Sequence, residues 1–319
     1  MEKDIISILD LASLSPSSHN TQPWKVIVKA RYIVVGYDPK RQLLVGDPEK
    51  RELYISLGCF TESIVLSASE LGYKSKIIFK DSNPAEVLTI TLSKNLAISS
   101  GWRDLIRYRR SDRRLYDKKP IEENILNELV DLSTTEVRLV LFTKEADIKF
   151  LSETTYESTL KIMTNKAFRE ELSSWVRNNW TKKHDGMPGY TQGMPGLVSL
   201  MARLIVSKNS KVAISQAKKD SKRIKNSSSA GLICVKKDTP EQWITAGQIY
   251  QRACLLLTKQ GIKTSAISSA LIFDKTRQNI ITQLSLTSKP VVLMRLGYKN
   301  GKVKSSPRLK VDEFTTISY

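Results

Sequence analysis

Two stretches of this chain determine its predicted architecture, Glu52-Leu-Tyr-Ile-Ser-Leu-Gly58 and Glu241-Gln-Trp-Ile-Thr-Ala-Gly247. They lie in two long apolar segments that align at an offset of 189 positions and end at Gly72 and Gly261. A glycine inside a helix costs up to about 1 kcal/mol relative to alanine, so its presence at the same place in both segments indicates close approach of two helix backbones. The pattern predicts an internal duplication, with chance likeness between two apolar helices as the alternative.

The remaining elements are predicted from hydrophobic periodicity and from turn residues. Asp47 and Pro48 are expected to cap the first long helix and to occupy its first turn. A loop rich in Gly, Pro and Met is expected at 184–196, followed by a basic helical stretch. The predicted helices cover 4–14, 49–71, 102–108, 121–132, 146–163, 167–180 and 240–260, and the predicted strands cover 24–28, 32–37, 76–79, 87–92, 137–142, 231–235 and 290–296.

The composition is that of a globular protein. With 319 residues, 40% hydrophobic and 26% charged, the chain is neither disordered, collagen-like nor a coiled coil. No run approaches the roughly 18 apolar residues of a membrane span, and the N-terminus lacks the charge pattern of a signal peptide, so we expect a cytoplasmic protein with no membrane partner. Three cysteines without a C-x-x-C motif and only two histidines argue against a disulfide framework and against a metal centre.

The net charge of +19, from 51 basic and 32 acidic residues, leaves several partners open. Such an excess attracts nucleic acid, a membrane surface or phosphorylated small molecules, and a solvated lysine-rich surface is the alternative. Nucleic acid is the least favoured, because no helix-turn-helix, zinc-finger, RRM or OB signature occurs and aromatic residues do not alternate with the basic runs. The basic residues gather in 103–119, 208–225 and 299–310.

Two short stretches carry side chains suited to ligand binding. Ser15-Pro-Ser-Ser-His-Asn-Thr-Gln-Pro-Trp24 offers hydroxyls and amides to a polar heteroaromatic ligand, or it forms an ordinary capped connection. Arg109-Arg-Ser-Asp-Arg-Arg114 places guanidinium groups beside a hydroxyl, which suits a phosphate monoester, although a solvated basic turn is the alternative.

These stretches resemble the two signatures of the nitroreductase family. Pro-Ser-x-x-Asn-x-Gln-Pro-Trp is similar to the flavin-contact signature and Arg-Arg-Ser-x-Arg to the other, but their order along this chain is reversed. The reversal, together with motifs at 47–58, 246–252, 295–298 and 306–308, resembles the Acg-like branch over nearly the whole chain. The resemblance implies an α+β, nitroreductase-like fold in which one chain forms an internally duplicated pseudo-dimer, with central antiparallel sheets flanked by helices.

The resemblance also implies how the chain divides and where FMN binds. An N-terminal half, 1–98, carries the first signature, and a C-terminal half, 99–319, carries the second together with a lid at 184–196, for which a flexible connector is the alternative. One FMN site is implied between the halves. The cofactor-binding residues implied by similarity are Pro16, Ser17, Ser18, Asn20, Arg109, Arg110, Ser111, Arg113, Ser268, Ser269 and Arg308.

Individual roles follow from the same resemblance. Arg109 and Arg308 are expected at the phosphate, Ser111 in the ribityl-phosphate region and Arg113 near the pyrimidine edge of the ring, where a cation stabilises negative charge. The backbone near Ser268 and Ser269 is expected at flavin N5, although the usual Glu-Gly is missing there. His19 is expected either to contact a ligand or to serve a structural polar role.

The function implied is that of an FMN-dependent oxidoreductase. NAD(P)H reduces the flavin at N5, and a nitroaromatic, a quinone or a similar small acceptor then takes its place in a ping-pong cycle, so no side chain need act as a nucleophile. The alternative is a non-catalytic protein that stores or sequesters FMN beneath the lid. Cys59 and Cys254, in apolar surroundings, are expected to be packing residues. The sequence does not indicate whether such chains associate further.

Overall fold

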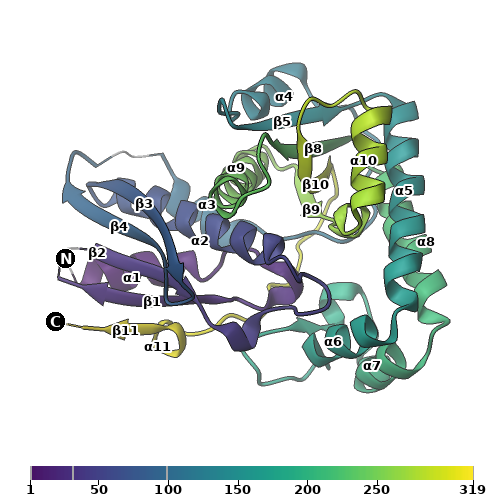
Figure 1. The fold of residues 1–319 in the computed structure, drawn as a ribbon, viewed down its shortest axis with the longest axis horizontal. Coiled ribbons are helices and arrows are strands. Elements are labelled where there is room, and N and C mark those ends of the chain that lie inside the picture. Colours follow the sequence, from purple (N-terminus) through teal and green to yellow (C-terminus); the bar gives the residue numbers. More distant parts are fainter. Residues whose placement is uncertain (1, 31, 98–99, 319) are drawn as a thin grey trace.

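The computed structural model describes residues 2–30, 32–97 and 100–318, and its centre is a pair of long helices. These are α2 (Arg51–Glu70) and α9 (Pro240–Lys259), which pack against each other between two β-sheets (Figure 1). The predicted α+β class is confirmed. The other α-helices are α1 (Glu2–Ala12), α3 (Trp102–Tyr108), α4 (Glu123–Val130), α5 (Glu145–Thr164), α6 (Lys166–Trp175), α7 (Gly196–Lys208), α8 (Val212–Lys225), α10 (Asp274–Gln283) and α11 (Val311–Phe314).

The two sheets are antiparallel apart from one strand pair. The first has the order β11-β1-β2-β4-β3 and the second the order β5-β8-β10-β9. The exception is β11, which pairs with β1 in parallel and so returns the end of the chain to the sheet formed by its beginning. The strands are β1 (Trp24–Lys29), β2 (Tyr32–Tyr37), β3 (Tyr73–Asn83), β4 (Glu86–Lys94), β5 (Val137–Phe142), β6 (Val176–Arg177), β7 (Met187–Pro188), β8 (Ser229–Val235), β9 (Lys263–Ala266), β10 (Lys289–Gly297) and β11 (Thr315–Ile317).

The close approach predicted for Gly58 and Gly247 is present where α2 and α9 cross. A side-chain carbon added to Gly58 would overlap the carbonyl oxygen of Ile244, and one added to Gly247 would overlap that of Ile55. Only glycine therefore fits at either position. A continuous hydrophobic core surrounds the crossing and includes Phe60 from the first part of the chain and many residues from the second. The boundary expected between residues 98 and 99 lies outside the described residues.

The first long helix begins two residues later than predicted. Lys50 adopts a left-handed conformation with φ of 62°, which delays the helix start to Arg51. The carboxylate of Asp47 still caps it, accepting hydrogen bonds from the main-chain N–H groups of Glu52 at 3.1 Å and Leu53 at 2.9 Å. Asp47 thus satisfies two N–H groups that have no partner inside the helix.

Several elements were not predicted, and one predicted helix is too long. The helix expected at 167–180 ends at Trp175, because the next two residues form β6 and pair with β7. The unpredicted elements include α7, α10, α11, β9 and β11. No helix among the described residues is both long and apolar enough to cross a membrane.

Candidate functional site

Two adjoining pockets lie where the turn before β1 meets the second sheet and the helices α5 to α8. The larger has a volume of about 310 Å³ and the smaller about 50 Å³. All eleven residues predicted to bind the cofactor line one or both pockets. Ser18, Ser268 and Ser269 line the larger pocket, Asn20, Arg109, Arg110 and Arg308 line the smaller, and Pro16, Ser17, Ser111 and Arg113 line both.

Four arginines dominate the smaller pocket. Arg109 and Arg308 each donate a hydrogen bond from Nη2 to the carbonyl oxygen of Leu14, at 3.0 and 3.2 Å, so their guanidinium groups converge. The Nε atoms of both are buried without a partner in the described part of the chain. Arg110 donates only to main-chain carbonyls, and the side chain of Arg113 forms no hydrogen bond among the described residues.

No carboxylate lies within ion-pair distance of these charges in the described part of the chain. None of the four guanidinium groups forms an ion pair with any residue that the structure describes. Burial, followed by repulsion from Arg109 and Arg110, lowers the pKa of Arg308 to about 9, so it is still protonated at neutral pH. Burial is also the main cause of the lowered pKa of Arg113. Because buried charge without a counter-charge is costly, the pocket favours a bound anion such as a phosphate monoester.

A buried arginine outside the pocket shapes the arginine-rich turn. Arg295 on β10 donates to the carbonyl oxygens of Asp112 at 2.6 Å and Arg114 at 2.8 Å, and its guanidinium lies 3.8 Å from the ring centroid of Tyr116. The main-chain N–H of Asp112 donates to Thr264 on β9 at 3.0 Å. The motif at 295–298 therefore fixes the turn that presents Ser111 and Arg113.

The first signature forms a strained turn that joins three segments. His19, Asn20 and Gln22 all have φ near +50°, a left-handed conformation that few side chains adopt. The Asn20 amide donates to the carbonyl oxygens of Gly186 at 2.9 Å and Pro307 at 3.0 Å, and its Oδ1 accepts from Arg308 at 2.5 Å. The amide of Asn20 is thus occupied by protein partners.

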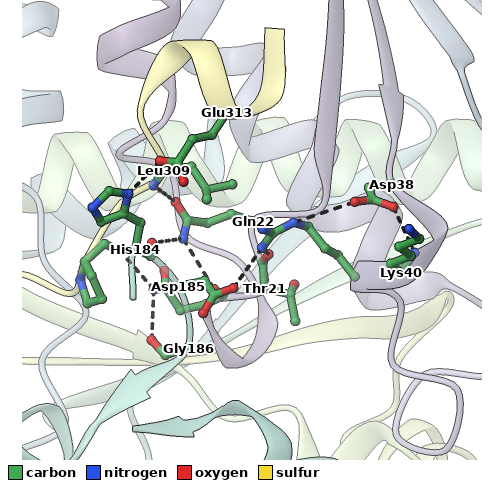
Figure 2. Close-up of polar contacts among 12 residues, drawn as sticks. Thr21, Gln22, Asp38, Lys40, His184, Asp185, Gly186, Leu309 and Glu313 are labelled. Carbon is green, nitrogen blue, oxygen red and sulfur yellow. Dashed lines mark hydrogen bonds and ion pairs between the residues drawn. The ribbon is translucent and has the colours of Figure 1, made fainter. Parts of the chain in front are cut away.

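Gln22 makes the same three-way connection. Its Nε2 donates to the carbonyl oxygen of His184 at 2.8 Å, and its Oε1 accepts from the N–H of Leu309 at 2.9 Å (Figure 2). The signature amides therefore hold together the turn, the start of the 184–196 segment and the loop at 307–309 that precedes α11. This structural role was not anticipated from the sequence.

The 184–196 segment forms a wall of both pockets. Met187, Gly189, Gln192 and Met194 line the larger pocket, and Met187 also lines the smaller. Its start is anchored by ion pairs. His184 Nδ1 lies 2.6 Å from Glu313 Oε2 (Figure 2). Asp185 pairs with Arg41 at 3.2 Å and with Arg177 at 2.8 Å.

Glu52 was not predicted as a site residue, yet it connects the two sides of the larger pocket. Its Oε2 accepts hydrogen bonds from Ser18 at 2.7 Å and from Ser268 at 3.0 Å, which lie 250 positions apart. Ser269 accepts from the hydroxyl of Thr159 at 2.7 Å. The signal was present in the sequence, since Glu52 belongs to the motif at 47–58.

Part of the basic cluster at 208–225 also reaches the larger pocket. Lys219 and Arg223 on α8 line it. Arg223 pairs with Asp220 at 2.9 Å and donates from Nε to the carbonyl oxygen of Arg113 at 2.8 Å. This cluster is therefore not only a solvated face, because α8 supports the turn that carries Arg113.

Cys59 and Cys254 are buried, and His19 is half-buried with its Nδ1 atom shielded from solvent. Burial, followed by repulsion from Arg113, lowers the pKa of His19 from 6.5 to about 4, so the ring is neutral at physiological pH. Its Nδ1 has no hydrogen-bond partner among the described residues, and its ring contacts Phe168 edge-on. Burial raises the pKa of the Cys254 thiol to about 11, and burial also raises the pKa of the Cys59 thiol well above its ordinary value, as expected of packing residues. No group of three or more potential metal ligands occurs in the described ranges.

Comparison with known proteins gives matches over almost the whole chain. The chain is 23% identical over 315 residues to "Putative NAD(P)H nitroreductase Rv3131" of Mycobacterium tuberculosis, with 92% of this chain and 84% of that protein covered. It is 25% identical over 182 residues to "Putative NAD(P)H nitroreductase acg" of the same organism, with 54% of each covered. The chain resembles the Acg-like nitroreductases. The resemblance predicted from the motifs is thereby confirmed, although no family model matches.

Solved structures of nitroreductases are also similar. The FMN-dependent nitroreductase NfnB of Mycobacterium smegmatis, determined in complex with NADPH, is 17% identical, with a TM-score of 0.45 and with 67% of this chain and 96% of that chain covered. A nitroreductase with bound FMN from Bacteroides fragilis is 14% identical, with a TM-score of 0.42 and with 67% and 97% covered.

Proposed function

We propose that this Acg-like protein binds FMN and acts as an oxidoreductase, taking electrons from NAD(P)H and passing them to a small acceptor such as a nitroaromatic or a quinone. The observation that carries the proposal is the cluster of four arginines, of which Arg109 is buried and the others are partly buried, at one end of a larger cavity and without an ion pair among the described residues. The names of the relatives, NAD(P)H nitroreductases, support the same reaction class.

The residues present fit a flavin mononucleotide. Arg109 and Arg308 would hold the phosphate, because their convergent guanidinium groups lack an anionic partner and Nε of each lacks any partner among the described residues. Ser111 and Arg113 line both pockets, so they would contact the chain between phosphate and ring. The positive charge of Arg113 would favour negative charge on the ring. Bound FMN supplies the hydride and electron transfer itself.

Other residues of the chain would shape and shield the site. Glu52 holds Ser18 and Ser268 in fixed positions on opposite sides of the larger pocket. Met187 and Met194 cover the pocket and would exclude water from the reacting face. His19 is neutral, so it adds no charge beside Arg113.

We also propose that the two halves, 1–98 and 99–319, correspond to the two protomers of a dimer and share this one site. The turn at Pro16–Asn20 would come from the first half, and Arg109, Ser268 and Arg308 from the second. The glycine crossing of α2 and α9 supports the pairing, because each half contributes one of these helices.

A second function, storage or sequestration of FMN, is favoured by one observation. The 184–196 segment walls the cavity and is anchored by the ion pairs of Asp185, so it could block the place of the nicotinamide. Binding would then be the whole function, with no turnover.

Anaerobic reduction distinguishes the two functions. FMN-loaded protein is mixed with NADPH and, separately, with NADH, and the flavin absorbance near 450 nm is followed. Loss of colour within seconds is expected of the enzyme. Persistent colour with both donors, followed by bleaching with dithionite, would contradict the oxidoreductase and support FMN storage. A prior titration compares FMN with riboflavin, which lacks the phosphate. Binding of FMN no tighter than riboflavin would overturn both functions.

A further inference from the structure

The helix α7 differs from an ordinary surface helix, because its large apolar side chains are exposed and its small side chains are buried. Its buried residues are the small or short side chains Ser199, Ala202 and Val206. Six large apolar side chains on the same helix point to solvent instead, with exposed fractions between 38% and 78%. These six residues, Leu197, Val198, Leu200, Met201, Leu204 and Ile205, are called the α7 apolar face below.

An exposed tryptophan extends this face. Trp180 is 61% exposed, and its ring lies against Gly196 at the start of α7. The helix itself lies at the periphery of the molecule, at the lower right in Figure 1. Soluble proteins rarely expose so many contiguous apolar side chains unless the patch binds something.

The sequence on and around α7 is rich in basic residues, and Arg203 and Lys208 belong to the helix itself. The segment 180–225 contains ten basic and only two acidic residues. Both acidic residues are already paired, Asp185 with Arg41 and Arg177, and Asp220 with Arg223. The exposed cations that remain form no ion pair among the described residues: Lys182, Lys183, Arg203, Lys208, Lys211, Lys218, Lys219, Lys222 and Lys225.

We propose that the α7 apolar face and its basic surroundings are a docking surface for an anionic lipid bilayer. An apolar helix face flanked by Lys and Arg, with tryptophan at its end, has the composition of helices that lie in the membrane interface. A second copy of the chain fits less well, because face-to-face association would bring two sets of like charges together. Docking in this sense needs no membrane span, although it departs from our expectation that the protein has no membrane partner.

The docking surface is joined to the candidate site. Val206 lies on the inner side of α7 and lines the larger pocket, and Ser199 accepts a hydrogen bond at 2.9 Å from the N–H of Asn179. The side chain of Asn179 in turn accepts from the N–H of Tyr190, at 2.6 Å, within the 184–196 segment. A bilayer bound to α7 would therefore lie against the same structural unit that lines the pocket.

Vesicle co-sedimentation tests the proposal without any redox step. The full chain is mixed at physiological salt with vesicles of phosphatidylcholine containing 30% phosphatidylglycerol, or of phosphatidylcholine alone. We expect binding to the anionic vesicles at least tenfold tighter than to the neutral ones. Leu200→Ser/Leu204→Ser should weaken it at least tenfold. The matched control Leu44→Ser/Leu96→Ser, which alters two leucines that are 69% and 84% exposed elsewhere, should stay within twofold.

Two further measurements keep the result unambiguous. The tryptophan emission should shift to the blue on adding anionic vesicles, and Trp180→Phe should remove most of that shift. Circular dichroism should be unchanged in every variant, because the altered side chains are exposed. Absence of binding to anionic vesicles would overturn the proposal, as would binding that Leu200→Ser/Leu204→Ser leaves unchanged. A dimer in sedimentation velocity that this variant dissociates would instead assign the face to a second copy.

Discussion

Arg113 lines both pockets without a hydrogen bond or an ion pair from its side chain among the residues that the structure describes. A charged side chain without a protein partner lowers the stability of the folded protein, so its position is explained by a ligand that it binds. We expect Arg113→Met to weaken FMN binding by about 10- to 100-fold, the worth of one charge-assisted hydrogen bond. The same change should stabilise the flavin-free protein by about 1–2 kcal/mol, because it removes a partly buried charge that has no ion-pair partner among the described residues.

Fluorescence titration of FMN and urea unfolding of the flavin-free protein measure these two effects. Arg107→Met is the matched control, since Arg107 is 51% exposed and lies outside both pockets. It should change neither quantity. Full FMN affinity in Arg113→Met would refute the placement of this residue beside the cofactor.

His19 gives the stability a pH dependence with a definite sign. Its pKa is lowered to about 4 in the folded protein, mainly by burial, whereas the unfolded chain titrates near 6.5. Between these values the unfolded state binds a proton that the folded state does not, so the free energy of unfolding decreases as pH falls from 6.5 to 4, by up to about 3 kcal/mol.

His19→Asn should remove this dependence, because asparagine tolerates the left-handed backbone and does not titrate. Urea unfolding at pH 4.5 and at pH 7 measures it. The other histidine supplies the control: His184→Asn should retain the part of the pH dependence that His19→Asn removes. Equal slopes in wild type and His19→Asn would show that the folded protein can protonate this ring.

At the scale of elements, hydrophobic periodicity predicted the helices and strands that bury an apolar face. It missed the elements that lack such a face. The boundaries of β5 match the prediction to the residue, and those of α2 and α9 within two residues, because caps and glycines mark them. In α7 the large apolar side chains face solvent, so the pattern of a surface helix is absent. The sequence of α10 is largely polar, and β9 and β11 are short, so little local signal marked them.

The crossing of α2 and α9 is expected to be intolerant of any side chain. Gly58→Ala should destabilise the protein by about 3 kcal/mol despite the higher helix propensity of alanine, because the two backbones must separate. Thermal or urea unfolding measures the loss. Thr245→Ala on α9, which replaces a half-buried side chain away from the crossing, should cost less than about 0.5 kcal/mol. Similar stabilities for the two variants would contradict the close packing.

At the scale of the whole molecule, one core and one ligand site should couple both halves. If FMN binds between them, a concentration of 100 times its Kd should stabilise the folded chain by about 2.7 kcal/mol and raise Tm by about 5 °C. Differential scanning calorimetry should show a single transition that moves as one. Two transitions, of which FMN shifts only one, would argue against a site shared by the halves.

The sequence alone determined the α+β class, the positions of the long helices and their glycine contact, and the resemblance to Acg-like nitroreductases, because caps, periodicity and motifs are local. The eleven residues that it named for the cofactor all line one or both pockets, but it missed Glu52. Only the tertiary structure brought Ser18 within reach of Glu52 and Ser268, assigned Asn20 and Gln22 to joining segments almost 300 positions apart, and turned the apolar side of α7 outward. Those outcomes depend on contacts between distant parts of the chain, which no local pattern encodes.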